Sequence, residues 1–393
     1  MKTSILSLLL PVLANGAAVQ LEPRQSGMMD MLKGMTKGMA TKAYKIEPLT
    51  PRNPAAKRIR MTWGPLKLRG ANSTTKVGSG MSMDPGGTGH NFLVDTDFPT
   101  DVTLLDGVVE VQGMDFKRVT LDQNVYTHHY LVYDLMKPQK PSFTCANGKS
   151  ISYVPIPGTV VLGGAAEDAE AHYATPTMKK TGYYVKKDTP ILMNLDVVNY
   201  NPADIDVYAS ADIEYIPGKP EGMLDASPVF VPVSACDKGM VIPGIVMTPK
   251  GQNKFTLNST SIIASEDSLM FMFRGHMHDG GSNIEVKIND KVACNSKAIY
   301  GGPGHVGKTH DGKSWETIGA MVTCPEGVMV KKGDKIDIQA NYDLLAHPAR
   351  EAGHGHGGGM LGGMLGGLLG GGDGMAEQMA VSIIYVAPLN PKA

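Results

Sequence analysis

Two pairs of histidines have the residue type and the spacing to bind a metal ion. His276 and His278 follow an apolar segment, residues 269–274, and two glycines come shortly after them. On a β-strand, residues i and i+2 point to the same face about 7 Å apart at Cα, so both imidazoles can converge on one ion. A pair of surface or core histidines is the alternative interpretation.

His128 and His129 lie inside another apolar segment, residues 125–135. Adjacent residues of a regular strand face opposite sides, so both imidazoles can reach one ion only at a β-bulge or at a strand end. Otherwise one histidine lies in the core and the other outside it. His354 and His356 could also bind a metal, but ordering their Gly-rich segment would cost conformational entropy.

The segments that must position these histidines are predicted to be short strands. From about residue 48, apolar stretches rich in β-branched residues alternate with Gly, Pro, Asn and Asp, and no long helix is indicated. The chain is therefore predicted to be all-β, with two tandem jelly-roll-like antiparallel β-sandwich domains. The clearest predicted strands are 102–111, 125–135, 191–200, 206–216, 269–274, 283–288, 335–342 and 380–387.

Prolines and glycines in residues 217–222 predict the boundary between the two domains. The first domain is predicted at residues 48–217 and the second at 223–390. A low-complexity insert with 13 Gly and three Met, residues 353–375, interrupts the second domain. A Met-rich N-terminal segment, residues 19–47, contains a methionine stripe that predicts a frayed helix or a tail.

The composition argues against some partners. Lys and Arg number 37 and Asp and Glu 38, for a net charge of −1, so neither nucleic acid nor an anionic membrane is an expected partner. A small-molecule or peptide substrate is expected, and the protein is expected to be a monomer. The 25 Met beside 8 Phe indicate either loose packing or contact with a soft metal such as Cu(I).

The beginning of the chain resembles a cleaved signal peptide, residues 1–18. A lysine precedes an apolar run that is too short to span a bilayer, and small residues follow it. Asn72 and Asn258 begin triplets typical of glycosylation, so the protein is expected to be secreted and soluble. Four cysteines then predict two disulfides, and we expect Cys294 to pair with Cys324 because they bracket one β-rich stretch.

Three segments, taken in order, carry a family resemblance. Residues 126–133 contain His128-His129, residues 274–281 contain His276-X-His278, and Met379 follows an acidic residue just before the last predicted strand. Together they resemble the His-His strand, the His-X-His strand and the methionine turn of the ascorbate-dependent type II copper monooxygenases. That family contains peptidylglycine α-hydroxylating monooxygenase and dopamine β-monooxygenase, and the resemblance covers most of the chain after about residue 95.

The resemblance implies two sandwiches that each hold one copper ion and face each other across a solvent-filled cleft. It implies that His276, His278 and Met379 bind the copper at which oxygen abstracts hydrogen from a C–H bond. It also implies that His128 and His129 bind an electron-donating copper, with ascorbate as the reductant. A thioether suits Cu(I), and imidazole suits both oxidation states.

Two positions bear on how far the resemblance extends. Asn199 stands where the family has a third histidine, and a neutral amide is a poor Cu(I) ligand, so His172 or His90 would have to replace it. Arg274 matches the arginine that holds a substrate carboxylate in the peptide-hydroxylating branch. The residues after Met379 are apolar where that branch has polar partners, which predicts a more apolar pocket.

Three functions remain open at this point. The leading hypothesis is a secreted copper-dependent monooxygenase that uses one or two copper ions to hydroxylate an aliphatic C–H bond of a small or peptide-like substrate. The second is a secreted copper-binding or copper-scavenging protein on the same scaffold, which Asn199, the Met-rich start and His354 favour. The third is an extracellular structural or adhesive protein without a metal.

Overall fold

Strands make up nearly all of the regular structure. Across the described residues there are 25 strands, one 3-10 helix, η3 (Leu121–Gln123), and no α-helix, which confirms the all-β prediction. The predicted signal peptide, methionine stripe and Gly/Met-rich insert lie outside those residues. The structure is a computed structural model that describes residues 42–390 except 75–76, 79–81, 83–85, 95–97, 140–141, 149–150, 152–157, 166–168, 175–179, 238–243, 309–313 and 350–376.

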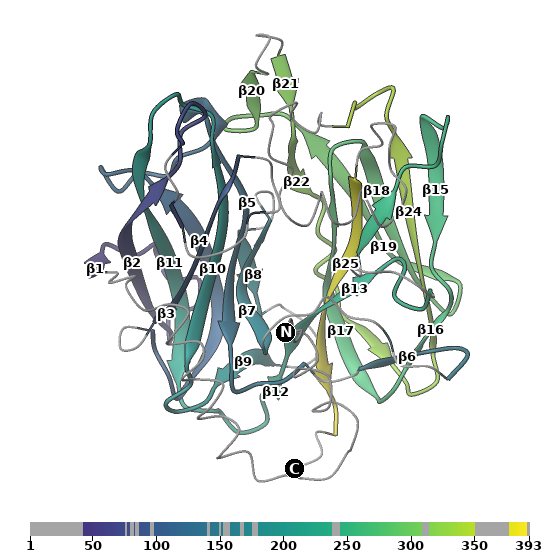
Figure 1. Cartoon of the computed structure of the whole chain (residues 1–393). Coiled ribbons are helices and arrows are strands. Elements are labelled where there is room, and N and C mark those ends of the chain that lie inside the picture. The colour runs from purple at the N-terminus through teal and green to yellow at the C-terminus, as the bar shows by residue number, and fades with distance from the viewer. Residues whose placement is uncertain are drawn as a thin grey trace, which may run out of the picture. The chain divides into compact units, whose positions relative to one another are not determined.

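The first two sheets are built mainly from the N-terminal half of the chain and share an apolar core that includes Trp63, Tyr130 and Val132 (Figure 1). The larger sheet runs in the order β1 (Lys42–Ile46), β2 (Lys57–Leu68), β11 (Ile205–Pro217), β4 (Val102–Gln112), β9 (Thr181–Val185) and β12 (Leu224–Asp225), with β8 (Glu170–His172) paired to β4. The smaller sheet runs in the order β3 (Thr88–Val94), β10 (Ile191–Asn199), β5 (Val125–Asp134) and β7 (Thr159–Ala165).

Two further sheets form a second sandwich around a separate core that includes Phe273, Ile284 and Ile384. One sheet runs in the order β13 (Ser227–Pro232), β25 (Glu377–Pro388), β17 (Ser268–Met277) and β23 (Val328–Val330), with β14 (Ile245–Met247) paired to β25. The other runs in the order β22 (Ile318–Met321), β19 (Lys291–Tyr300), β18 (Gly281–Ile288), β24 (Lys335–Asp343), β16 (Ile262–Ala264) and β6 (Phe143–Cys145), with β15 (Lys254–Asn258) paired to β24. The strands β20 (Val306–Lys308) and β21 (Ser314–Glu316) pair antiparallel in a separate two-stranded sheet.

All of the strands predicted from sequence are present. The pattern succeeds because the predicted segments are rich in β-branched or aromatic residues and are bounded by turn residues, which is the local signal of a strand. The strand β6 shows that this local signal does not identify the sheet that a strand joins. Although it lies within the range predicted for the first domain, it pairs with β16 of the second sandwich, as its colour in Figure 1 makes visible. The domain boundary at 217–222 stays a prediction.

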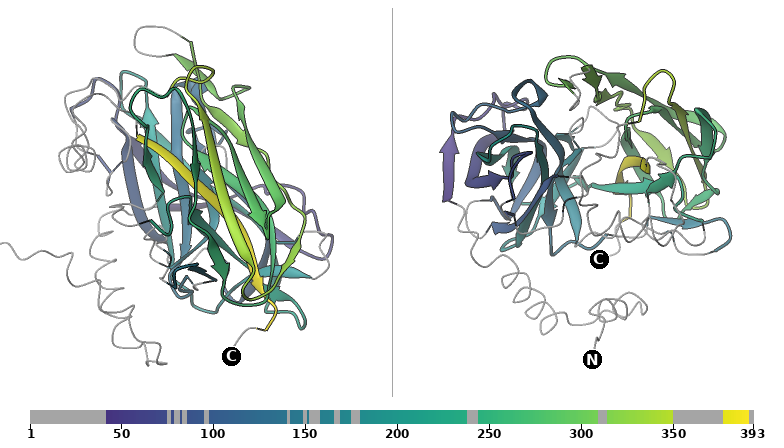
Figure 2. Two further views of the ribbon diagram at one scale, coloured as in Figure 1. Left: turned by 90° about the vertical axis from the view of Figure 1, so that its right-hand side faces the viewer. Right: turned by 45° about the horizontal axis from the view of Figure 1, so that its top comes forward.

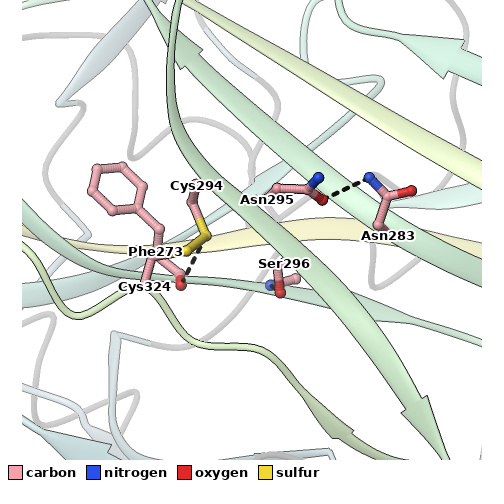
Figure 3. Close-up of a disulfide and its surroundings, with 7 residues drawn as sticks. Phe273, Asn283, Cys294, Asn295, Ser296 and Cys324 are labelled. Carbon is pink, nitrogen blue, oxygen red and sulfur yellow. Dashed lines mark hydrogen bonds between the residues drawn. A yellow bond between two sulfur atoms is a disulfide. The ribbon is translucent and has the colours of Figure 1, made fainter.

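Two disulfides cross-link segments of the second sandwich. Cys145 of β6 is bonded to Cys236, and Cys294 of β19 is bonded to Cys324, which confirms the predicted pairing (Figure 3). Cys324 also exchanges backbone hydrogen bonds with Phe273 of β17 at 2.9 and 3.0 Å. The second disulfide therefore fixes the segment that borders the middle of β17.

Strands β17 and β25 contribute side chains to both cores. Their side chains alternate between the second core and the first, so that Phe271, Ile383 and Tyr385 pack with the first sandwich. The ring of Tyr385 lies 5.1 Å from that of Tyr173, centroid to centroid. One face of this strand pair is thus directed at the first sandwich, and Figure 2 shows β25, in yellow, in two further views.

No helix among the described residues is long and apolar enough to cross a membrane.

The two disulfides should contribute unequally to stability. They link residues separated by 91 and by 30 positions in sequence, and a longer closed loop removes more entropy from the unfolded chain. Replacing Cys145 and Cys236 by Ser should therefore cost about 1 kcal/mol more than replacing Cys294 and Cys324, out of a total of roughly 3 to 5 kcal/mol each. Urea unfolding of the two double variants measures the difference, and the reverse order would contradict it.

Candidate metal centre

A β-bulge brings His128 and His129 together on β5. Along β10, Asp196 pairs with His129 and Val197 pairs with Thr127, so His128 is an extra residue in the β5 strand. The two imidazole centroids lie 5.3 Å apart. Two imidazoles bound to one ion at about 2 Å have centroids roughly 5 to 6 Å apart. The bulge therefore provides the condition under which adjacent histidines can share an ion.

Asp196 of β10 is the third donor beside these histidines. One potential ligand atom from each of His128, His129 and Asp196 lies within 4.8 Å of the other two. Asp196 is buried, its Oδ2 lies 3.4 Å from Nδ1 of His128, and its Oδ1 accepts a hydrogen bond from the Ser82 hydroxyl at 2.5 Å. This set of two imidazoles and one carboxylate is called the first cluster below.

The carboxyl of Asp196 is held in its ionised form. Burial alone raises the pKa of a carboxyl, but the hydrogen bond from His128, and its charge when the ring is protonated, outweigh this effect, with smaller contributions from His129 and Ser82. The pKa of Asp196 therefore lies below its usual value, and at neutral pH the side chain is a carboxylate that accepts hydrogen bonds or binds cations.

A chain of amides orients His129. Nδ2 of Asn194 donates to Oδ1 of Asn91 at 2.6 Å, which leaves Oδ1 of Asn194 to accept from His129 Nε2, also at 2.6 Å. A neutral His129 that donates from Nε2 carries its lone pair on Nδ1, so this contact selects the tautomer. Asn194 acts on His129 as the outer hydrogen-bond partners of metal-binding histidines do.

A second bulge determines the direction of His276 and His278. In the pairing of β17 with β25, Phe271 is opposite Tyr385 but Arg274 is opposite Ile383, so β17 contains one extra residue. A bulge residue in the left-handed region, Met272 with φ of 50°, lies within this shift. Without the shift, strict alternation would turn both histidines into the core of the second sandwich.

After the bulge, Met277 points into that core, and His276 and His278 point to the opposite face, where both are half-buried. Their ring centroids lie 5.8 Å apart, a separation compatible with two ligands of one ion. The i, i+2 argument from sequence identified this shared face, and the bulge decides which side of the sheet it is.

Met379 lies on the strand opposite these histidines. In the register of β17 with β25, His276 is opposite Val381 and Met277 is opposite Ala380. Continuing that register by one residue aligns His278 with Met379, and directly opposite residues share a face. Met379 is half-buried while the neighbouring Ala380 is in the second core, so Met379 points away from that core. On the basis of this register, His276, His278 and Met379 are grouped below as the second cluster.

The two clusters meet where His128 faces His278. Their ring centroids lie 5.7 Å apart, with the planes inclined by 64°. The four histidines thus form a continuous series from His129 through His128 and His278 to His276. The resemblance implied a solvent-filled cleft between the two centres, and the structure differs here because rings this close leave no room for a layer of water between them.

Aromatic side chains cover one end of this series. Asp279, which follows His278 and is buried, accepts hydrogen bonds from the Trp315 indole N–H at 3.2 Å and the Thr317 hydroxyl at 2.9 Å. The Trp315 ring contacts Tyr126 edge to face at 6.0 Å, and Tyr126 in turn stacks near His128 at 6.4 Å. The strand β21 therefore connects the second cluster to the first.

The structure does not bring Asn199, His172 or His90 to the first cluster. Asn199 is three residues from Asp196 on β10, so it faces the other side of the strand, where its Oδ1 accepts from the backbone N–H of Asn201 at 3.0 Å. Nε2 of His90 lies 2.9 Å from the carbonyl oxygen of Lys67. Each of the proposed replacements for a third histidine is thus engaged elsewhere.

His172 belongs to an ion-pair group on β8. Its Nδ1 lies 2.5 Å from Oδ2 of Asp106, and its Nε2 lies 2.8 Å from Oε2 of Glu170. Burial opposes protonation of the ring, but hydrogen bonds to these two carboxylates outweigh it and raise the pKa of His172 to about 9. A protonated imidazole has no lone pair for a metal.

Arg274 lies between the two sandwiches. It is buried, and its Nη1 and Nη2 each lie 3.4 Å from the carbonyl oxygen of Glu170, while its side chain also hydrogen-bonds to Tyr385. These contacts attach β17 to β8. Binding of a substrate carboxylate by Arg274 stays a prediction.

Asp196 is the donor that the sequence interpretation missed. The available signal was a single charged residue in the apolar run 191–199, which becomes β10. A carboxylate at such a position must be paired, hydrogen-bonded or bound to a cation to be stable. Its partner could not be identified without the pairing of β10 with β5.

Comparisons with known proteins give a distant relative. No family model matches the chain. The chain is similar to the probable copper-dependent oxygenase M1 of Phoma sp., with 20% identity over 231 residues, which are 58% of this chain and 53% of that protein. The match thus spans about half the length of that relative.

Two solved structures are also similar in part. PNGF-II matches with a TM-score of 0.34 and 11% identity over 93% of this chain and 68% of its own. The major capsid protein P2 from bacteriophage PM2 matches with a TM-score of 0.31 and 9% identity over 90% of this chain and 99% of its own. At these TM-scores neither likeness supports an argument about this protein.

Protonation of His172 should stabilise the fold over a defined pH range. Because its folded pKa of about 9 exceeds the usual value near 6.5, its contribution is fully present below about pH 6.5 and is lost as the pH rises through about 9. His172→Gln should therefore lower the unfolding free energy at pH 6 and have little effect at pH 10. Urea unfolding across this range measures the difference, with His347→Gln as a control histidine variant. If the loss of unfolding free energy in His172→Gln grew with pH, the raised pKa of His172 would be contradicted.

Proposed function

We propose that this chain is a secreted copper-dependent oxygenase that hydroxylates an aliphatic C–H bond of a small or peptide-like substrate. The observation that carries the proposal is the series of four histidines, flanked by Asp196, at the contact of the two sandwiches. Imidazole and thioether are ligands that suit copper. The distant similarity to a protein named a probable copper-dependent oxygenase supports the same metal.

Each of the two clusters would hold one copper ion. His276, His278 and Met379 would hold the copper at which oxygen reacts, and His128 and His129 would hold a second copper. Bound copper would supply one-electron redox chemistry and the activation of oxygen. In the overall reaction one oxygen atom enters the C–H bond and the other leaves as water, with two electrons and two protons supplied by a reductant such as ascorbate.

The residues of the chain position and shield the site. The two bulges direct the histidines to one region, Asn194 selects the tautomer of His129, and the hydrogen bonds of Asp279 hold the backbone just after His278. Trp315 packs on Tyr126, which in turn stacks near His128, and the ring of His128 is buried. Such fixed surroundings limit the reorganisation that a reaction at the site would require.

Secretion is part of the same proposal. Two disulfides are typical of proteins in oxidising compartments, and the described cysteines are all paired. Asn72 and Asn258 are exposed, so both could accept a glycan. Recovery of a glycosylated protein from the culture medium after expression of the full chain would support secretion.

Removal of one ligand from the second cluster should weaken copper binding. His276→Ala and Met379→Ala should each reduce the affinity for Cu(I) by more than about 100-fold, since even the loss of an outer partner of a ligand costs 10–100-fold. Competition with a Cu(I) chelator measures the affinity. Met329→Ala, at a methionine that is 41% exposed, is the matched control and should leave it unchanged. If His276→Ala and Met379→Ala bound Cu(I) as tightly as Met329→Ala does, the proposed site would be refuted.

The second candidate is a copper-binding protein without hydroxylase activity. The contact of His128 with His278 favours it, because these rings leave no space between the clusters for a substrate. The two functions differ in turnover. The oxygenase should consume oxygen when ascorbate and copper are both present and should lose this consumption in Met379→Ala, whereas the binding protein should hold copper tightly with no oxygen uptake above that of free copper.

A further inference from the structure

We infer that Asp196 completes a site for a divalent transition-metal ion with His128 and His129, and that this site prefers divalent ions to Cu(I). The inference deepens the proposed function, since it assigns a ligand and an ion class to the first cluster. It does not require the second cluster to bind copper. Nothing in the sequence resemblance assigns a carboxylate to this position.

The geometry of the first cluster fits one ion. Its three potential donor atoms lie within 4.8 Å of one another. Tetrahedral ligands at about 2.0 to 2.2 Å from one ion lie roughly 3.3 to 3.6 Å apart, so binding would draw these donor atoms together by at most about 1.5 Å. The donors come from two hydrogen-bonded strands, β5 and β10, and the bulge at His128 places all three at one point of that pair.

Neighbouring side chains orient two of the three donors, Asp196 and His129. The Ser82 hydroxyl donates to Oδ1 of Asp196, which leaves Oδ2 directed at His128. Asn91 and Asn194 select the His129 tautomer whose lone pair is on Nδ1. This is the arrangement of ligand and outer hydrogen-bond partner that raises affinity in known metal sites.

The donor set selects the class of ion. A buried carboxylate is a hard, negatively charged ligand, and two imidazoles with one carboxylate suit divalent first-row ions such as Zn(II), Cu(II) and Fe(II). Cu(I) prefers thioether and thiolate, which the second cluster supplies through Met379 and the first cluster lacks. The negative charge of Asp196 also neutralises half of a divalent ion, which lowers the cost of burying it.

Zn(II) is a suitable probe because it has no redox chemistry. The His276→Ala protein serves as the background, so that the second cluster does not compete. It should bind one Zn(II), and the added change Asp196→Asn should weaken that binding at least tenfold while changing the affinity for Cu(I) less than about threefold. Calorimetry measures Zn(II) binding, and chelator competition measures Cu(I).

Two controls test whether the loss of affinity is specific to the carboxylate of Asp196 and whether each variant folds. Asp206→Asn removes a half-exposed carboxylate that pairs with Lys67 and should leave Zn(II) binding unchanged. The melting temperature of each apo protein shows whether it folds. If Asp196→Asn does not fold, Asp196→Ser replaces it, and Asn194→Ala, which keeps the carboxylate, should weaken Zn(II) binding about 10- to 100-fold.

The outcomes separate this inference from the proposed function. Unchanged Zn(II) affinity in Asp196→Asn, or an equal loss of Zn(II) and Cu(I), would overturn the inference and leave the second cluster untouched. Retained Cu(I) affinity in Met379→Ala would overturn the proposed copper site and leave the divalent site standing.

Discussion

Side chains alternate strictly between the two faces of a β-strand, and the candidate centre depends on two bulges that interrupt this alternation. In β5 the bulge at His128 turns two adjacent histidines to the same region, beside Asp196. In β17 the extra residue between Phe271 and Arg274 moves His276 and His278 from the core face to the opposite face. A one-residue slip at either place would return a histidine to a core, where a metal could not reach it.

The contact between the two sandwiches brings the bulged strands together. The face of β17 and β25 that carries His276 also carries Phe271 and Tyr385, which pack with the first core. Arg274 attaches this face to the carbonyl of Glu170, and Trp315 attaches the other end to Tyr126. The ring contact of His128 with His278 follows from this packing, and it places the two clusters next to each other.

The two clusters differ in the side chain that is proposed as a further ligand beside their histidines. The first has the carboxylate of Asp196, whose charge favours a divalent ion, and the second has the thioether of Met379, which favours Cu(I). If both bind copper, the first therefore stabilises the oxidised ion and the second stabilises the reduced ion. Such a pair would differ in reduction potential even though each has two imidazoles.

The sequence by itself determined the strands and the histidine pairs, and it correctly predicted the pairing of Cys294 with Cys324 from the β-rich stretch that they bracket. The strands and the histidine pairs are local signals, because strand-forming runs, turn residues and the spacing of two residues on one strand do not depend on distant parts of the chain. Only the tertiary structure decided which donors meet. Asp196 is 67 residues or more from either histidine of its cluster, and Asn199, three residues further along, faces away from it. The register between β5 and β10 decides that Asp196, and not Asn199, lies beside the histidines. The pairing of strands distant in sequence is set by the packing of the whole sandwich and not by either strand alone.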